Sequence, residues 1–236
     1  AFHLPKQRED HHRQLRHRII RIRGIDLDGI GQGAHPDLTL LKIMDQVESV
    51  PDGAAQPVDE TLVIGAHMDH VGMGGPGSGS LKPDTVAIHH GADDNASGTA
   101  GLLETAQYFA SKRASLRRSI LFASFSGEEL GLLGSDYYVK HPTVPLASSI
   151  AMINMDMIGR FKDSILVVEG IGTSPGFDSL VHKESTDPSI ILKLKQDGYG
   201  PSDHASFYSK DMPVLFFFTN LHDDYHRPSD TWEKIN

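Results

Sequence analysis

Apolar residues form five short, nearly continuous runs in the last three-quarters of the chain. They are TLVIGA (61–66), SILFASF (119–125), IAMINM (150–155), ILVVEG (165–170) and PVLFFF (213–218). Runs of this length without polar alternation are typical of strands that are buried on both faces. Three intervening segments, 98–110, 128–138 and 177–184, carry apolar residues at helical spacing. This alternation predicts an α/β protein, a single domain with a mixed, mostly parallel β-sheet and helices on both faces.

The first 58 residues have a weaker pattern than the rest. Residues 18–23 favour a strand, and residues 38–47 form an apolar segment. We therefore expect residues 1–58 to supply edge elements of the same domain, and we place the main domain at 59–236.

Charge and composition exclude several classes of protein. The formal net charge is −9, yet the first 25 residues hold seven Lys/Arg against two acidic residues. The remainder is therefore strongly acidic, which argues against nucleic acid as the main partner. No run reaches the roughly 20 apolar residues of a membrane span, and none has the apolar core of a signal peptide. Without cysteine, the chain has no disulfide, thiolate nucleophile or cysteine metal ligand.

Five side chains of the kinds that bind metals follow the predicted strands or lie between them. They are His67 in GAHMDHVG, Asp94 in GADDNASG, Glu129 in SGEELG, Asp156 in INMDMIG and His226 in YHRPSDT. Two imidazoles and three carboxylates suit two zinc ions that share one carboxylate. In open α/β sheets, ligands bind beyond the carboxyl ends of the strands, so we expect these side chains to converge there. The pattern predicts a metal-dependent hydrolase.

Residues beside these ligands predict a division of labour. Asp69 follows His67 by two positions and is placed to accept a hydrogen bond from the second ring nitrogen of that histidine. Glu128 precedes Glu129, so one carboxylate can bind metal while the other takes a proton from water and delivers it to the leaving amine. The Gly/Pro/Ser-rich connection 72–91 has no periodicity of its own, and we expect it at the rim of the active site.

Together and in this order, the five motifs resemble those of the co-catalytic di-zinc aminopeptidase family. Its relatives include bacterial leucine aminopeptidases, glutamate carboxypeptidase and the glutaminyl cyclases, and the resemblance covers about residues 59–236. It implies that His67 and Asp156 hold one zinc ion, and that Glu129 and His226 hold the other. Asp94, rather than Asp93, would bridge the two ions, and the peptide bond after the bridging residue is expected to be cis.

The resemblance also assigns catalytic roles and an activity. Glu128 matches the general base, and Tyr199 in GYGPSDHASF matches a tyrosine that hydrogen-bonds the tetrahedral intermediate in some relatives. The implied activity is that of an exopeptidase with two Zn²⁺ per chain, most readily an aminopeptidase that cleaves peptides or small aminoacyl substrates by a water held between the metals. A secreted or periplasmic location is implied as well.

Three other functions stay open from the sequence. A glutaminyl-cyclase-like acyl transferase would use the fold with one zinc ion. A carboxypeptidase would need a cation for the terminal carboxylate, and Arg160 and Arg227 lie closest in sequence to the ligands. A non-catalytic binding domain would hold no metal. Metal content therefore discriminates among these functions.

Each ligand also has a purely structural alternative, because carboxylates often cap helices or occupy their first turn. The joint order of all five favours metal binding. Other polar residues receive structural interpretations. We expect His70, His89 and His90 to be loop residues near the entrance, His222, Asp223 and Asp224 to form a polar turn, and Asp203 and His204 to form a capping turn before a helix.

Overall fold

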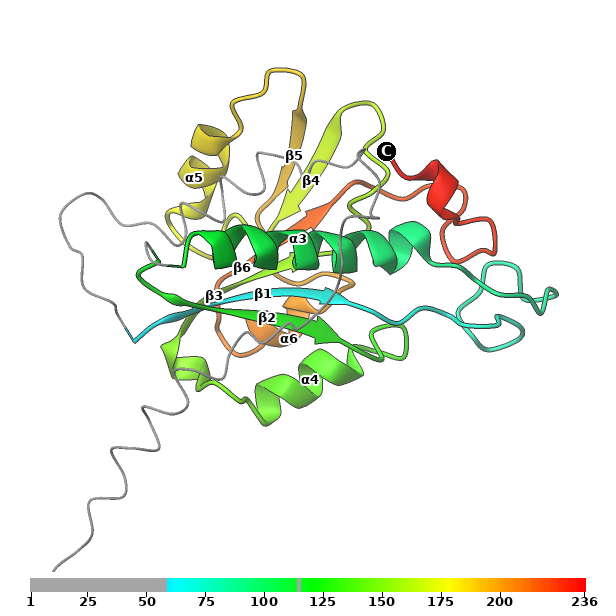
Figure 1. The fold of residues 1–236 in the computed structure, drawn as a ribbon, viewed down its shortest axis with the longest axis horizontal. Helices are drawn as coiled ribbons and strands as arrows, with labels where there is room; N and C mark the ends of the chain where they lie inside the picture. Colours follow the sequence, from blue (N-terminus) through cyan, green and yellow to red (C-terminus); the bar gives the residue numbers. More distant parts are fainter. Residues whose placement is uncertain (1–58, 114–115) are drawn as a thin grey trace, which may run out of the picture. The chain divides into compact units, whose positions relative to one another are not determined.

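A six-stranded sheet runs through the described part of the chain, which comprises residues 59–113 and 116–236 of the computed structural model (Figure 1). Its strand order is β2-β1-β3-β6-β4-β5. The strands are β1 (Thr61–His67), β2 (Ser119–Phe125), β3 (Ser149–Met155), β4 (Ile165–Glu169), β5 (Ile191–Lys195) and β6 (Val214–Phe218). β4 pairs with β6 in antiparallel fashion, and the other pairs are parallel. The predicted mixed, mostly parallel sheet is confirmed.

Successive strand residues point into two different apolar cores. Leu62 and Ile64 of β1 pack with Ile153 of β3 in one core. Val63 of β1 and Met152 of β3 lie in the other core, and all five side chains are fully buried. Because adjacent strand residues face opposite sides of the sheet, burial of both faces requires the continuous apolar runs seen in the sequence.

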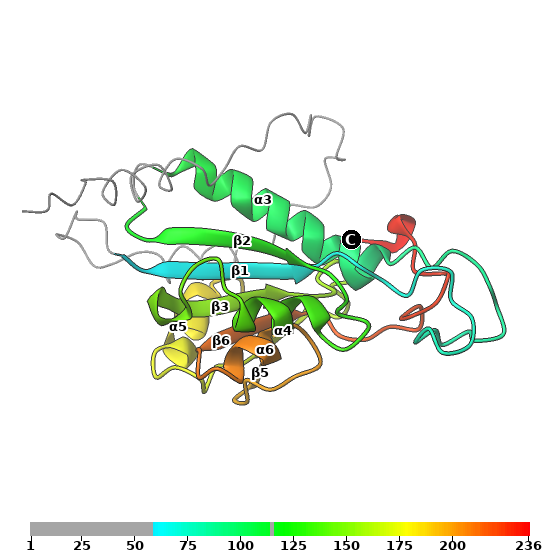
Figure 2. The same ribbon diagram turned by 90° about the horizontal axis from the view of Figure 1, so that it is seen from below.

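Helices cover both faces of the sheet. α3 (Gly98–Ser111) packs against the first core together with α5 (Phe177–Glu184). α4 (Leu133–Lys140) and α6 (His204–Tyr208) pack against the second core, and Figure 2 shows them across the sheet from α3. Shorter helical turns are η1 (Ala92–Ser97), η2 (Leu146–Ser148) and η3 (Trp232–Lys234). Within the described residues, no helix combines the length and apolar character needed to cross a membrane.

The structure differs from the sequence-based prediction at two elements. The helix expected over 128–138 starts only at Leu133, because Gly131 (φ 101°) and Leu132 (φ 60°) adopt left-handed conformations that interrupt a helix. β5 was not predicted, since its ILKLK sequence alternates and lies at the edge of the sheet. The strand expected at 18–23, the apolar segment 38–47 and the proposed edge role of 1–58 lie outside the described residues.

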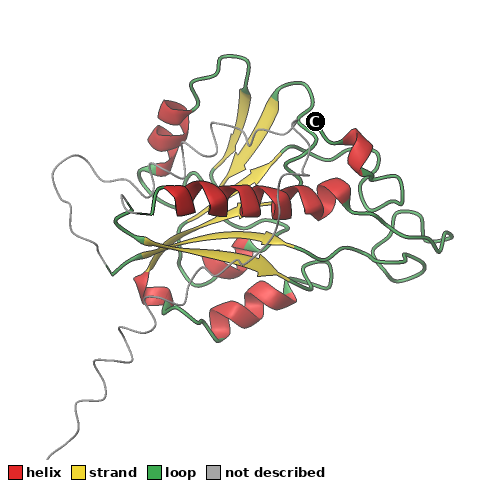
Figure 3. Cartoon of the chain, viewed as in Figure 1, coloured by secondary structure: helices red, strands yellow, loops and turns green. Residues whose placement is uncertain are grey.

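Two long loops lie side by side beyond the arrowheads of β1 and β2 (Figures 1 and 3). One holds residues 68–91, and the other follows β6. The backbone N–H of Leu81 donates to the carbonyl of His226 at 2.9 Å. The connection 72–91 therefore lies next to one of the predicted ligands, as expected for the rim of the site.

Candidate metal centre

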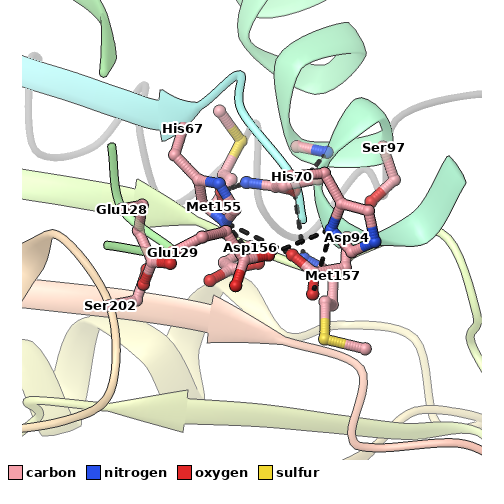
Figure 4. A network of polar contacts seen from close by, with 12 residues as sticks. His67, His70, Asp94, Ser97, Glu128, Glu129, Met155, Asp156, Met157 and Ser202 are labelled. Carbon is pink, nitrogen blue, oxygen red and sulfur yellow. Dashed lines mark hydrogen bonds and ion pairs between the residues drawn. The ribbon is translucent and has the colours of Figure 1, made fainter. Parts of the chain in front are cut away.

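The five predicted ligands come together at one edge of the sheet. His67 ends β1 and Asp156 directly follows β3, while Glu129 and His226 lie on the connections after β2 and β6. These four strands are neighbours and run parallel, so their carboxyl ends share an edge. Asp94 reaches the same place from η1 at the start of α3, and Figure 4 shows it facing His67.

A first group of ligand atoms surrounds the ring of His67. Its Nε2 atom lies 3.3 Å from Oδ1 of Asp156 and 3.4 Å from Oδ1 of Asp94. Within the described part of the chain, His67 Nε2 and Asp156 Oδ1 are buried without a well-formed hydrogen bond. Buried polar atoms nearly always have partners. A metal ion between these atoms would satisfy them, so the donor set fits a cation.

A second group surrounds the ring of His226. Its Nε2 atom lies 3.1 Å from Oδ2 of Asp94 and 3.0 Å from Oε2 of Glu129. Asp94 is 3% exposed and turns Oδ1 toward the first group and Oδ2 toward the second. One carboxylate therefore stands between two clusters of potential ligands.

The two adjacent aspartates of η1 point in different directions. Asp93 is fully buried, accepts a hydrogen bond from the N–H of Gly159 at 2.7 Å and pairs with Nε2 of His222 at 3.1 Å. The carboxylate of Asp230 accepts the backbone N–H groups of both Asp93 and Asp94, at 2.9 and 3.2 Å. Asp94, the aspartate chosen from the sequence, lies among the potential ligands, whereas the side chain of Asp93 points away from them and anchors the turn.

Asp69 contacts its neighbours differently from the expectation. The carbonyl of Asp69, rather than its carboxylate, is nearest to Nδ1 of His67, at 3.1 Å against 3.8 Å. The carboxylate instead accepts the N–H groups of Glu128 and Glu129, at 3.1 and 3.4 Å. The chain turns after β1, which brings the main-chain oxygen of Asp69 to Nδ1 of His67 and directs the Asp69 side chain toward the Glu pair.

The histidines of the two groups are strongly basic in the metal-free chain. Burial lowers the pKa of His67, but contacts with Asp156, Glu128 and Asp94 outweigh burial and raise the pKa to about 10. Burial also lowers the pKa of His226, and here Asp94 and Glu129 raise it to about 10. Both rings are therefore protonated on both nitrogens at neutral pH in the metal-free chain, and metal binding requires loss of the proton on Nε2.

The adjacent glutamates titrate far apart. Burial raises the pKa of Glu128 to about 8, helped by Asp156, although the charge of His67 opposes the shift. Burial would raise the pKa of Glu129 too, but His226 and His70 outweigh it and lower the pKa to about 2. Glu129 is thus an ionised ligand, and Glu128 has a pKa near the range useful for proton transfer.

Other polar residues near the site take structural positions. Tyr199 is 60% exposed, and its ring meets that of Tyr208 edge-on with centroids 4.7 Å apart. Its proposed hydrogen bond to a reaction intermediate stays a prediction. Asp203 and His204 are buried where α6 begins, and His204 stacks on Phe216 at 4.3 Å. Neither belongs to the groups of potential ligands found among the described residues.

Two residues of the site were missed by the sequence analysis. His70 was expected to be a loop residue, yet its Nδ1 atom lies 3.0 Å from Oε1 of Glu129, and His70 forms a potential ligand group with Asp94 and Glu129. Tyr225 stacks on His226 with ring centroids 3.8 Å apart, and burial together with the nearby carboxylates raises its pKa. The repeated histidine in HMDH was the only sequence signal for the first, and adjacency to His226 the only one for the second.

Comparison with known proteins identifies the family. Residues 47–236 match the family model described as peptidase family M28. The chain belongs to peptidase family M28. This family membership agrees with the di-zinc aminopeptidase resemblance of the motifs, and the Asp94–Asn95 peptide bond is cis, as expected there.

This chain is similar to only part of the length of each of its relatives. Leupeptin-inactivating enzyme 1 of Streptomyces exfoliatus is 31% identical over 179 residues, which are 75% of this chain and 36% of that protein. Aminopeptidase YwaD of Bacillus subtilis is 31% identical over 162 residues, 65% of this chain and 35% of that protein. The chain thus spans about a third of the length of these two relatives.

Solved structures show the same fold. The LapA aminopeptidase of Legionella pneumophila matches with a TM-score of 0.59 and 27% identity, over 75% of this chain and 46% of that one. BSAP, a zinc aminopeptidase from Bacillus subtilis, matches with a TM-score of 0.57 and 28% identity, over 80% of this chain and 44% of that one. The predicted fold class is confirmed by these similarities.

Proposed function

We propose that this chain is a zinc-dependent aminopeptidase that works with two zinc ions. The observation that carries the proposal is the position of Asp94, whose two carboxylate oxygens face two separate clusters of imidazole and carboxylate ligands. The names of the similar proteins, among them a zinc aminopeptidase, support the same activity.

The residues fit zinc in number and kind. His67 and Asp156 would hold one ion, Glu129 and His226 the other, and Asp94 would bridge. Imidazole nitrogens and carboxylate oxygens are common ligands of Zn²⁺ in catalytic sites. When bound, the zinc ions supply polarisation of the scissile carbonyl and a lowered pKa of water.

A backbone carbonyl contacts the Nδ1 atom of each of the two histidines and so fixes the orientation of both rings. Nδ1 of His67 faces the carbonyl of Asp69 at 3.1 Å, and Nδ1 of His226 faces the carbonyl of Gly79 at 2.9 Å. A carbonyl can only accept, so each Nδ1 carries the proton and each Nε2 is left to bind metal. The loop 72–91 supplies one of these carbonyls and thereby helps to fix a ligand.

Glu128 transfers the proton in this mechanism. A carboxylate oxygen of Glu128 lies within 4.8 Å of ligand atoms of His67 and Asp156. It takes a proton from the attacking water and delivers it to the nitrogen of the leaving amine. Asp69 positions Glu128, because its carboxylate holds the N–H groups at the start of the turn that carries the Glu pair. Tyr199 is proposed to donate a hydrogen bond to the substrate oxyanion.

The environment of Arg160 argues against a carboxypeptidase role for this residue, one of the two cations, with Arg227, that the sequence leaves open. A carboxypeptidase needs a cation free to bind the terminal carboxylate. The guanidinium of Arg160 instead contacts Asp224 at 3.0 Å and Asp230 at 3.8 Å. It is therefore engaged by two carboxylates of the C-terminal segment, and we propose a peptide or small aminoacyl substrate with a free amine.

The products of a tripeptide test this proposal. Leucyl-glycyl-glycine should release leucine, while its N-acetylated form should stay intact, as followed by mass spectrometry of the zinc-loaded chain. Glu128→Gln serves as the control for contaminating peptidases. Release of the carboxy-terminal glycine from both peptides would replace the aminopeptidase assignment with a carboxypeptidase.

A further inference from the structure

His70 faces the same two carboxylates as His226. Nδ1 of His70 lies 3.0 Å from Oε1 of Glu129 and 3.7 Å from Oδ2 of Asp94. Nε2 of His226 lies 3.0 Å from Oε2 of Glu129 and 3.1 Å from Oδ2 of Asp94. Figure 4 shows the His70 ring beside Asp94, with a dashed line joining the two residues. Two imidazole nitrogens therefore converge on one pair of acidic ligands.

The distances from each histidine to the two carboxylates are close to those expected between ligands of one metal ion. Ligand atoms placed tetrahedrally at about 2.0 to 2.1 Å from zinc lie roughly 3.3 Å from one another. The four measured separations are 3.0, 3.7, 3.0 and 3.1 Å, with His70 measured to Oε1 of Glu129, His226 to Oε2 of Glu129, and both histidines to Oδ2 of Asp94. Ligand atoms of His70, Asp94 and Glu129 lie within 4.8 Å of one another, and Nε2 of His226 contacts the same two carboxylates.

The fold holds the ring of His70 in this position. Its side chain is 9% exposed, and its ring meets that of His226 edge-on with centroids 5.6 Å apart. Gly91 lies against the ring, and a Cβ atom there would come within 2.7 Å of Cγ of His70. On another side lies His89, which is itself fixed by Ser80 Oγ at 2.7 Å and the Ala87 carbonyl at 3.0 Å. These contacts restrict the ring of His70, whose Nε2 atom is buried without a hydrogen-bond partner among the described residues.

We propose that His70 is a fourth protein ligand of the metal ion held by Asp94, Glu129 and His226. The inference rests on the proposed two-zinc function and extends the five-ligand set derived from the sequence. The two sites then differ. The ion near His67 has three protein ligands, His67, Asp94 and Asp156, and keeps a position open for water or substrate, as catalytic zinc sites do. The ion near His70 has four protein ligands and is held more tightly.

Zinc binding to single variants tests this assignment. The chelated full-length chain is titrated with zinc in competition with a chromophoric chelator, for the unsubstituted chain, His70→Ala, His70→Asn and His90→Ala. His90 is the matched control, because it is an exposed histidine of the same loop. The unsubstituted chain and His90→Ala should bind two zinc ions with unequal affinity. Both His70 variants should lose at least about 100-fold in affinity for the tighter ion, more than loss of an outer contact usually costs.

The asparagine variant separates a ligand from a hydrogen-bond donor. The Asn amide can donate to Glu129 much as an imidazole N–H would, but it is a poor zinc ligand. Retained affinity in His70→Asn together with loss in His70→Ala would overturn the proposal in favour of a donor role. Wild-type affinity in both variants would overturn it as well.

Failure of the underlying function gives a different result. If the unsubstituted chain binds fewer than two zinc ions, the two-zinc proposal itself is refuted. Circular dichroism of each chelated variant checks folding, and diffraction at the zinc edge provides a second measurement. A His70 Nδ1–zinc distance of about 2.1 Å is expected, whereas a distance beyond bonding range refutes the ligand role.

Discussion

Replacing Glu128 by glutamine isolates proton transfer from metal binding. Glutamine has the same shape and keeps the backbone N–H that donates to Asp69 at 3.1 Å. Glu128 is not among the residues paired with His226, whereas Glu129 contacts His226 at 3.0 Å and His70 at 3.0 Å. The carboxylate of Glu128 lies within 4.8 Å of ligand atoms of His67 and Asp156, but Glu128 is proposed as the base and not as a ligand. The variant should therefore bind zinc as the unsubstituted chain does and lose only the proton acceptor.

The expected loss follows from the role of a positioned acid–base group. Such groups contribute about 10² to 10⁴ in rate, which corresponds to roughly 2.7 to 5.4 kcal/mol of transition-state stabilisation at about 1.36 kcal/mol per factor of ten. Single-turnover hydrolysis of leucine p-nitroanilide gives the rate of the chemical step, and zinc content measured in the same samples shows whether metal binding is unchanged. Glu129→Gln is the matched control, and it should instead lose zinc. Full turnover in Glu128→Gln would refute the assignment of roles within the Glu pair.

Three further predictions concern the surroundings of the site. Zinc binding at pH 7 should release about two protons, because His67 and His226 have pKa values raised to about 10 in the metal-free chain and bind zinc only when deprotonated. Apparent zinc affinity should then rise with pH up to about 10, and calorimetry in buffers of different protonation enthalpy checks the count; an unchanged heat across buffers would contradict it. Asp230→Ala should weaken zinc binding about 10- to 100-fold and destabilise the fold by about 3 kcal/mol, since the Asp230 carboxylate accepts two buried N–H groups, including that of Asp94; chemical denaturation measures the stability, and a change below about 0.5 kcal/mol would show that the anchor is dispensable. Gly65→Ala should cost about 1 to 3 kcal/mol, because a Cβ there would lie 2.7 Å from Phe125 and 2.9 Å from Met152, and an unchanged midpoint of unfolding would mean that the core yields more easily than its packing indicates.

The strands of this fold were predictable because burial on both faces leaves an unbroken apolar run. The run at 150–155 corresponds to β3 almost residue for residue. β5 escaped prediction because an edge strand needs no such run, and its ILKLK sequence has Lys193 and Lys195 exposed to solvent. The late start of α4 depends on the left-handed conformation of Leu132, which no sequence rule assigns to a leucine.

The candidate site was predictable in its ligands more than in its supporting contacts. His67 and Asp156 end or follow buried strands, so the position of their side chains is set by the sheet. The supporting contacts join distant parts of the chain. Asp230 holds the N–H of Asp93 across 137 positions, and His70 reaches Glu129 across 59. Such pairings depend on the tertiary structure, and the sequence alone gave no spacing that would reveal them.

Stepwise restoration of zinc to the chelated chain tests whether the chain needs two zinc ions for peptide hydrolysis. Hydrolysis of leucine p-nitroanilide is followed as zinc is added in fractions of an equivalent. We expect no activity in the chelated chain and recovery that is complete at two zinc ions per chain. Full activity without zinc, or a chain that binds two zinc ions and cleaves no substrate with a free amine, would contradict this expectation.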